Sequence, residues 1–466
     1  MADDLRKSIH ENDFIIKHDK EDRNKQYTKM FFQRPLNFCQ AAAWVFVHYM
    51  TIGIIQGYYQ AVLFNIQSNG GTDDNQSTLS LAYYPYSFKF LFAPFLDRFF
   101  IRTFGRSKTY IITGGIVVGL LFMFLGGFVE TYVKHLNITP LTVIFFGVNF
   151  LVCIVQIAGE AWILTMFDKE GKTKAATFLN IGQTFGVVLG LNIFTPLNDV
   201  QWLNDNIFTK NPISSPIITH QMFCFFVAFL YIGQIVVNLL FIAEEKITDK
   251  KAKDIVRILS VVPRHVTNNH MRNFIFYMFG CRFIYFMIDF TLDLRLVRNG
   301  YLNLGRTTIT NMDMITYPIV FTVTVFTIYY MKKGQLIRMF HLNMFIIVLL
   351  GYFRYLLYLD LVENRNTTRV YISRMFAGIL TGMDFSTLFL MGFFNTIVNK
   401  SVGNTGITCL IALMNQTGVL SRTVGLSLTK YMSYGTFVNS CCIIQAILLV
   451  LLFPYAMVLD KKDIKL

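Results

Sequence analysis

Blocks of about 20 mostly apolar residues recur along the whole of this 466-residue chain. An α-helix of about 20 residues crosses the roughly 30 Å hydrocarbon core of a bilayer, whereas the strands of a membrane barrel alternate in segments of about 10 residues. The sequence therefore predicts an all-α polytopic membrane protein with about 12 transmembrane helices. They lie near residues 38–64, 78–101, 110–131, 141–167, 175–196, 217–243, 273–297, 308–331, 337–359, 370–398, 404–430 and 436–459.

The basic residues of the chain are distributed unevenly between the two sets of loops. The net charge is +14, and with the N-terminus placed inside, the inner segments hold about 29 Lys and Arg against about 7 in the outer loops. This asymmetry is the positive-inside pattern, and it places both termini on the cytosolic side of the membrane, or on the matrix side in a mitochondrion. The positive charge thus indicates topology, and we expect the lipid bilayer, not nucleic acid, as the partner.

The predicted spans fall into two groups of six. We expect a cytosolic tail over 1–37, a six-helix bundle over 38–243, a polar linker over 244–272, a second bundle over 273–459 and a basic tail over 460–466. The linker is either an amphipathic helix on the inner membrane surface or a solvated connector. Two six-helix halves joined by a cytosolic linker are typical of the major facilitator fold.

The loop between the second and third spans, residues 97–108, has the sequence DRFFIRTFGRSK. It resembles the D-R-x-G-R-R loop of major facilitators with an insertion. Asp97, Arg98, Gly105 and Arg106 would form an ion pair and a tight turn at helix ends, a latch that holds one conformation of a transport cycle. The alternative is that the basic residues only anchor the inner surface.

Several stretches in both halves resemble the motifs of one transporter family. They are 84–97 (YPYSFKFLFAPFLD), 160–166 (EAWILTM), 180–190 (NIGQTFGVVLG), 289–300 with LRLV at its centre, and 403–418. In order and spacing they resemble the acetyl-coenzyme A transporter family, relatives of bacterial muropeptide permeases. The resemblance implies a facilitator fold, transport of acetyl-CoA and a location in the endoplasmic reticulum.

The chain departs from the motifs of that family at several positions. Val155 and Gln156 stand where the fourth helix of the family carries Gln-Asp, Glu160 replaces an aspartate, and Arg422 lies where a Trp-Pro region is expected. The departures leave a second interpretation open, in which the chain is a structural subunit of a larger membrane complex, for example in the mitochondrial inner membrane. The tail over 1–37 would then bind protein partners.

Polar side chains inside the first-half spans are candidates for contact with a substrate. Lys89 lies near the middle of the second span, where a charge needs a cavity or a partner. It would bind a phosphate or carboxylate of an anionic CoA thioester, or form a structural ion pair with Asp97 or with an acid of another helix. Asn149, Gln156 and Glu160 share one face of the fourth span and favour a cavity wall.

The fifth span carries a row of glycines at intervals of four residues. Gly182, Gly186 and Gly190 predict close helix packing, because small residues let two helices approach. Gln183 and Thr184 beside this row are better candidates for contacting a ligand.

The second half contributes charged and amide side chains to the candidate site. Asp289 shares a face with Arg282 in the seventh span, and the mixed charges favour a structural network over a substrate contact. Asn415 and Arg422 share a face of the eleventh span with two glycines, and Arg374 repeats that pattern in the tenth. For these arginines a cavity and a helix contact are equally supported.

Residues suited to catalysis are sparse in the predicted spans. Of the 8 histidines, His48 alone lies well inside a span, and no Ser/His, His/Asp or metal-ligand spacing occurs. We therefore expect no enzyme, catalytic residue, metal or cofactor.

Overall fold

The computed structural model describes most of the predicted spans. The described residues are 32–69, 75, 78–79, 81–167, 169–244, 269–298, 316, 318–320, 322–323, 326, 335–364, 372–373, 375–376, 378–379, 403–429 and 431–459. The tail over 1–31, the linker over 245–268, most of the predicted spans 308–331 and 370–398, and the tail from 460 lie outside them.

Long uninterrupted helices form four of the six first-half spans, and their ends fall within a few residues of the predicted ones. They are α2 (Phe38–Ser68), α6 (Arg106–Lys134), α7 (Ile138–Met166) and α11 (His220–Leu240). Within the described residues, seven helices are long and apolar enough to cross a membrane. The prediction of an all-α polytopic membrane protein is confirmed.

The second predicted span is broken into three pieces. A 3-10 turn, η1 (Leu81–Tyr83), leads into the short α4 (Tyr84–Ser87), and α5 (Lys89–Arg98) follows after a break at Phe88. Pro85 lies in the first turn of α4, where a missing N–H costs nothing. Pro94 lies inside α5, where it removes one helical hydrogen bond. The break places Lys89 at the first position of α5.

The fifth span contains a π-helical segment between two α-helices. It consists of α8 (Lys169–Val187), a π-helical turn η2 (Val188–Ile193) and α9 (Phe194–Asn198), and α10 (Val200–Asn206) follows. α8 packs along α2 over most of its length. A Cβ atom at Gly182, Gly186 or Gly190 would overlap a backbone carbonyl oxygen of α2. The predicted close packing of this glycine row is therefore confirmed.

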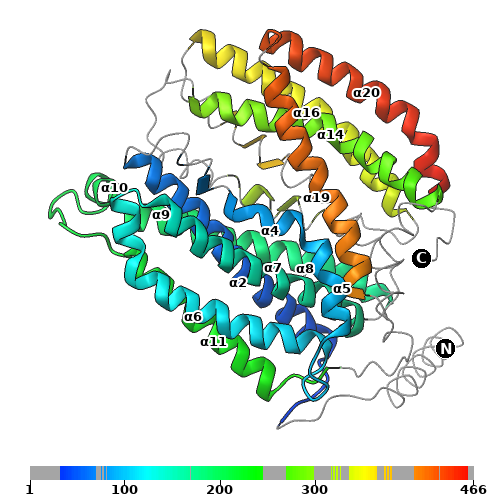
Figure 1. Ribbon diagram of the computed structural model, residues 1–466. Helices are drawn as coiled ribbons and strands as arrows, with labels where there is room; N and C mark the ends of the chain where they lie inside the picture. Colours follow the sequence, from blue (N-terminus) through cyan, green and yellow to red (C-terminus); the bar gives the residue numbers. More distant parts are fainter. Residues whose placement is uncertain are drawn as a thin grey trace, which may run out of the picture.

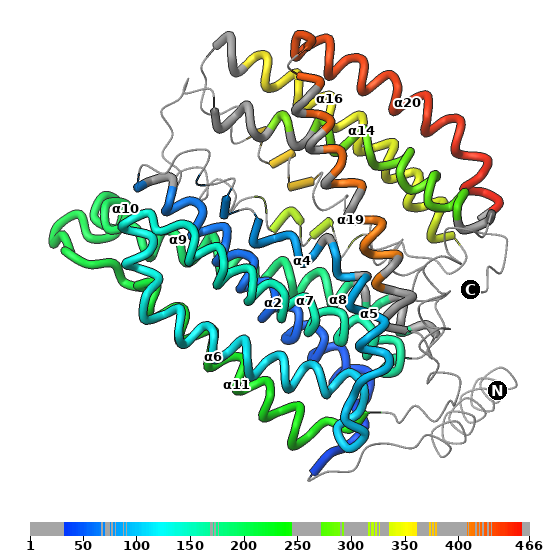
Figure 2. The backbone as a smooth tube through the Cα atoms, viewed as in Figure 1, coloured from blue at the N-terminus to red at the C-terminus, as the bar shows by residue number. Residues whose placement is uncertain are grey.

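The described second half contains α14 (Asn269–Arg298), α16 (Leu336–Asn364), α19 (Gly403–Leu428) and α20 (Tyr434–Leu459). α14 begins four residues before the predicted start of the seventh span at 273. Figures 1 and 2 show α14, α16 and α20 grouped on one side of the molecule, and the first-half helices on the other. α19 packs against α14 and also reaches α5 and α7 in the first half. It therefore joins the two groups.

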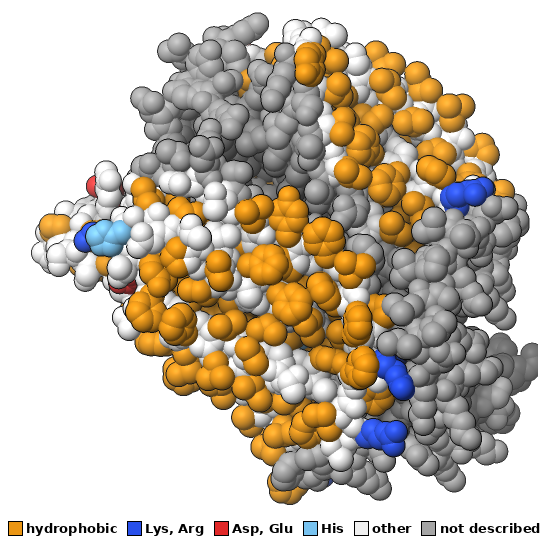
Figure 3. Space-filling model, viewed as in Figure 1, with side chains coloured by type: hydrophobic (Ala, Val, Ile, Leu, Met, Phe, Trp, Pro, Cys, Tyr) orange, Lys and Arg blue, Asp and Glu red, His pale blue; other side chains and the backbone are white. Residues whose placement is uncertain are grey.

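The surface of the first half is largely apolar. Large hydrophobic side chains on α6 and α11 point outward, among them Leu120 and Phe229 at 60% and 66% exposed. Figure 3 shows hydrophobic side chains spread over much of the described part of the visible face. In a bilayer this face contacts lipid, which suits the apolar side chains that predominate on the described part of α6 and α11.

Candidate functional site

A buried ion pair lies at the break in the second span. The Lys89 ammonium Nζ is 3.1 Å from Oε1 of Glu160 on α7, and each side chain is 1% exposed. Of the two partners considered for Lys89, Asp97 and an acid of another helix, the structure selects the second. Two opposite charges removed from water at this distance stabilise each other strongly and leave little net charge in the membrane.

Glu160 has binding capacity that the ion pair does not use. Its second oxygen, Oε2, is buried and has no hydrogen-bond partner among the described residues, and the buried Tyr49 hydroxyl of α2 likewise has none. The Tyr49 hydroxyl lies close to Gly159, the residue before Glu160, since a Cβ at Gly159 would be 3.3 Å from it. A buried carboxylate with a free oxygen can accept a further hydrogen bond or a proton.

The other polar residues of the α7 stripe fix the broken span in place. Asn149 is fully buried, and its side-chain amide donates to the Ala82 carbonyl at 2.8 Å. Cys153 lies 3.6 Å from the Pro85 carbonyl. Gln156 is 9% exposed, and its Oε1 has no hydrogen-bond partner among the described residues. The stripe therefore faces the broken span along the interior of the first half.

Gln183 and Thr184 lie on the side of the first half where α8 meets α2. Gln183 Nε2 donates to Oε1 of Gln56 at 2.8 Å. Thr184 is half-buried. The structure thus brings Lys89 together with Glu160, and Gln183 together with Gln56, a residue that the sequence had not singled out.

The second-half candidates are described by their backbones alone or lie outside the described residues. Asp289 is on α14, and Asn415 and Arg422 are on α19. Arg374 lies outside the described residues. α19 packs against both α5 and α7, the helices that carry Lys89 and Glu160.

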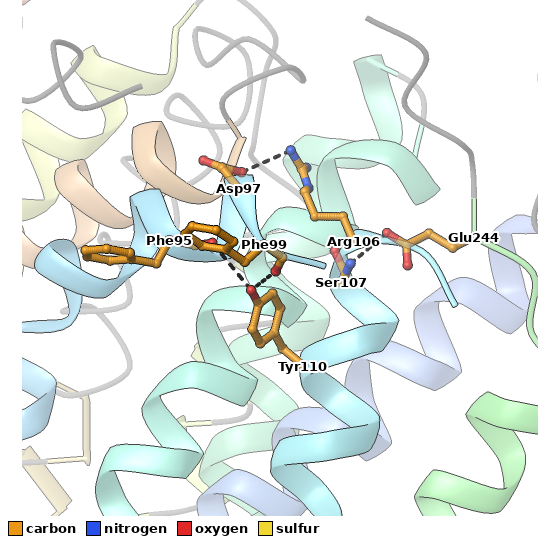
Figure 4. A network of polar contacts seen from close by, with 7 residues as sticks. All are labelled: Phe95, Asp97, Phe99, Arg106, Ser107, Tyr110 and Glu244. Carbon is orange, nitrogen blue, oxygen red and sulfur yellow. Dashed lines mark hydrogen bonds and ion pairs between the residues drawn. The ribbon is translucent and has the colours of Figure 1, made fainter. Parts of the chain in front are cut away.

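The predicted latch residues lie at the opposite end of α5 from Lys89. Arg106 contacts Asp97 with 3.0 Å between its guanidinium nitrogen and Oδ1, and both side chains are buried. Gly105 has a φ of +103°, which favours glycine. Arg98 is exposed and takes no part in the ion pair. Figure 4 shows how the ion pair ties the end of α5 to the start of α6.

Glu244, just after α11, binds the start of α6. Its carboxylate accepts hydrogen bonds from the backbone N–H groups of Ser107 and Lys108, both at 2.9 Å, as Figure 4 shows in part. Burial raises the pKa of Glu244, and these two hydrogen bonds and the nearby basic groups oppose that rise. A Cβ at Gly105 would overlap this carboxylate. A buried carboxylate therefore caps the positive end of the helix dipole.

One feature of the sequence indicated that α6 needs a hydrogen-bond acceptor such as Glu244 at its N-terminus. α6 begins at Arg106, and the residue before it, Gly105, has no side chain that could cap the N-terminus of the helix. A buried helix start without a local cap requires an acceptor from elsewhere in the chain. That acceptor comes from a residue more than 130 positions away, so the pairing itself was not predictable.

Replacing Glu244 with alanine is expected to lower the free energy of unfolding by about 1–3 kcal/mol, because two N–H groups would lose their charged acceptor. Thermal unfolding of the purified protein measures this loss. Glu130→Ala, at an exposed position of α6, is the control and should leave the melting temperature unchanged. Equal melting temperatures for Glu244→Ala and the wild type would contradict the assigned role.

Comparison with protein families and curated proteins identifies relatives of this chain. A sequence model described as "Acetyl-coenzyme A transporter 1" matches residues 44–278, half of the chain. An uncharacterized protein of Schizosaccharomyces pombe is 26% identical over 33% of this chain and 29% of its own length. An uncharacterized membrane protein of Saccharomyces cerevisiae is 29% identical over 36% of this chain and 32% of its own length. The matches thus span about a third of these curated relatives.

Comparison with solved structures extends over both halves. The major facilitator superfamily transporter FucP, in its outward conformation, aligns with a TM-score of 0.59 at 14% identity, over 91% of this chain and 100% of FucP. The human organic anion transporter MFSD10 aligns with a TM-score of 0.58 at 10% identity, over 90% of this chain and 100% of MFSD10. At such identities the likeness shows the fold alone, and that fold is the predicted major facilitator fold.

Proposed function

The chain belongs to the acetyl-coenzyme A transporter family, and from this we propose that it moves acetyl-CoA, or a similar CoA or nucleotide anion, by alternating access. That it is an integral membrane transporter follows from the family and the fold. The substrate and the mechanism are the proposal. By the same resemblance we propose the endoplasmic reticulum as its location, and a role without covalent chemistry.

The observation that carries the proposal is the buried Lys89–Glu160 pair. A CoA thioester is a polyanion, and a transporter must offer it cations without leaving an unpaired charge in the membrane when the site is empty. Glu160 would act as the resident counter-ion of Lys89. An arriving phosphate or carboxylate would replace Glu160 at the ammonium, with the unused Oε2 of Glu160 ready to take a proton or a hydrogen bond.

The helix that joins the two halves supports a site between them. α19, which carries Asn415 and Arg422, packs against α5, which begins at Lys89. Charged residues from both halves are thus carried by neighbouring helices. We propose that Lys89 and Arg422 bind the anionic part of the substrate, with Gln156, Gln183, Thr184, Asp289, Arg374 and Asn415 as further lining residues.

Uptake of labelled acetyl-CoA into liposomes that contain the purified protein tests this proposal. We expect saturable uptake that unlabelled CoA inhibits. Arg422→Ala should reduce uptake by about 10-fold or more, since an ionic hydrogen bond contributes about 1.5–3 kcal/mol. Arg272→Ala, at an exposed position near the start of α14, is the matched control and should transport normally.

An absence of uptake would change the proposed function. A folded wild-type protein that takes up neither acetyl-CoA nor CoA nor related nucleotide anions would overturn the proposed substrate class. The structural-subunit interpretation would then be tested by purifying the protein from its native membrane and identifying what co-purifies. Normal uptake by Arg422→Ala would remove that arginine from the site while leaving the substrate class intact.

A further inference from the structure

We propose that the end of α5 and the loop after it, residues 98–103, bind the headgroup of an anionic phospholipid at the membrane surface, beside the Asp97–Arg106 ion pair. The inference needs only the membrane fold and does not rest on the proposed substrate. It gives a role to the insertion that distinguishes this loop from the shorter facilitator motif.

A continuous apolar stripe leads to this loop along the outer face of the second span. It consists of five side chains that are 45–59% exposed and three or four positions apart, namely Tyr84, Phe88, Leu91, Phe95 and Phe99. Tyr84 lies on α4, Leu91 and Phe95 share one face of α5, Phe88 is at the break between the two helices, and Phe99 follows α5. An apolar groove of about 410 Å³ lies beside the stripe, between α4–α5 and α7, with Phe92 and Phe146 in its wall. Acyl chains of the bilayer are the natural occupants of such a surface.

Two arginines lie where the stripe ends. Arg98 and Arg102 are both exposed, and neither makes an ion pair or hydrogen bond with any residue in the described part of the chain. The nearest carboxylate in sequence, Asp97, is buried and bound by Arg106. The guanidinium groups thus have no counter-ion from the described residues, next to side chains that contact acyl chains. Phospholipid headgroups lie at this depth, and guanidinium binds phosphate with two hydrogen bonds.

The backbone of the loop is held in a fixed conformation. The Tyr110 hydroxyl of α6 donates to the carbonyl oxygens of Phe95 and Phe99, as Figure 4 shows. Oγ1 of Thr109 accepts a hydrogen bond from the Ile101 N–H at 3.1 Å. A preorganised loop loses less conformational freedom when it binds a ligand. Arg106, Thr109 and Tyr110 all lie in the first turns of α6. A headgroup bound to the loop would therefore also stabilise the connection between α5 and α6.

The test measures lipid retention, not transport. The purified protein is incubated with equal amounts of phosphatidylserine and phosphatidylcholine in detergent, and bound lipids are counted by native mass spectrometry. We expect phosphatidylserine to be retained on the order of tenfold more than phosphatidylcholine, since each basic residue near an anionic surface contributes a factor of about five. The variant Arg98→Gln/Arg102→Gln should lose this preference. Arg98→Lys/Arg102→Lys, which keeps both charges, should keep most of it.

Lys174→Gln is the matched control, because Lys174 is an exposed basic residue on another helix, α8. It should retain phosphatidylserine as the wild type does. Equal retention of the two lipids by the wild type would overturn the proposal, and so would an unchanged preference in the double glutamine variant. Displacement of phosphatidylserine by millimolar inorganic phosphate would also overturn it, because the site would then be a general anion site. All of these substitutions are at exposed positions, so each variant should have the melting temperature of the wild type. Measuring that temperature verifies that the variants are folded.

Discussion

Substitution of Lys89 by methionine is expected to lower the free energy of unfolding by about 3–5 kcal/mol and to abolish uptake of acetyl-CoA. The ammonium of Lys89 is the ion-pair partner of Glu160, and both side chains are 1% exposed. Removal of one member of a buried pair leaves the other charge without compensation, and losses of about 3–5 kcal/mol follow. Thermal unfolding in detergent and uptake into liposomes measure the two effects.

A second variant separates the structural role of the pair from its role in transport. Lys89→Met/Glu160→Gln removes both charges at once, so most of the lost stability should return. Uptake should stay absent, because no cation remains at the start of α5 to meet the anionic substrate. Lys134→Met removes an exposed lysine at the end of α6 and should change neither quantity.

The two measurements can contradict the proposal in different ways. If the double variant regains both stability and uptake, the pair is a structural element and Lys89 does not bind substrate. If Lys89→Met is as stable as the wild type, the ion pair does not contribute to the fold. Loss of uptake together with restored stability in the double variant is the single combination that supports the assigned role.

The positions of the long described helices were predictable because the bilayer imposes their length. α6, α7 and α16 are each long and apolar enough to cross a membrane, and their ends fall within about five residues of the predicted ones. The second span was also located correctly, but its break at Phe88 was not predicted. Two prolines marked the segment without specifying at which residue the helix would stop.

Pairings between distant residues were not predictable from one sequence. The polar stripe on α7 was recognised, and the partner of Lys89 was narrowed to two options, because a charge inside a membrane needs compensation. Which acid it meets depends on how the broken span packs on α7. In the same way, the loop 97–108 was recognised as a unit, whereas Glu244 reaches it only through the folded arrangement of α6 and α11.

Leucine at Gly186 is expected to prevent folding of the first half, which makes it the most damaging single substitution among the glycines of the fifth span. A Cβ there would overlap the Met50 carbonyl and lie 2.7 Å from the backbone nitrogen of Ile54. Backbone atoms cannot rotate away as a side chain can, so α8 and α2 would have to separate. Even modest overpacking costs about 1–3 kcal/mol, and leucine adds three further carbon atoms.

Gly233→Leu on α11 provides a control with the same substitution, since no atom lies within 4 Å of a Cβ at Gly233 and the position is exposed. We expect the yield of monodisperse protein in size-exclusion chromatography to fall by about 10-fold or more for Gly186→Leu, which corresponds to at least about 1.4 kcal/mol. Gly233→Leu should match the wild type, because leucine is suited to a lipid-facing helix position. Equal yields for both variants would show that α2 and α8 are not held together by this glycine row. The fold would then depend on other contacts of the first half, such as those of α6 with α11.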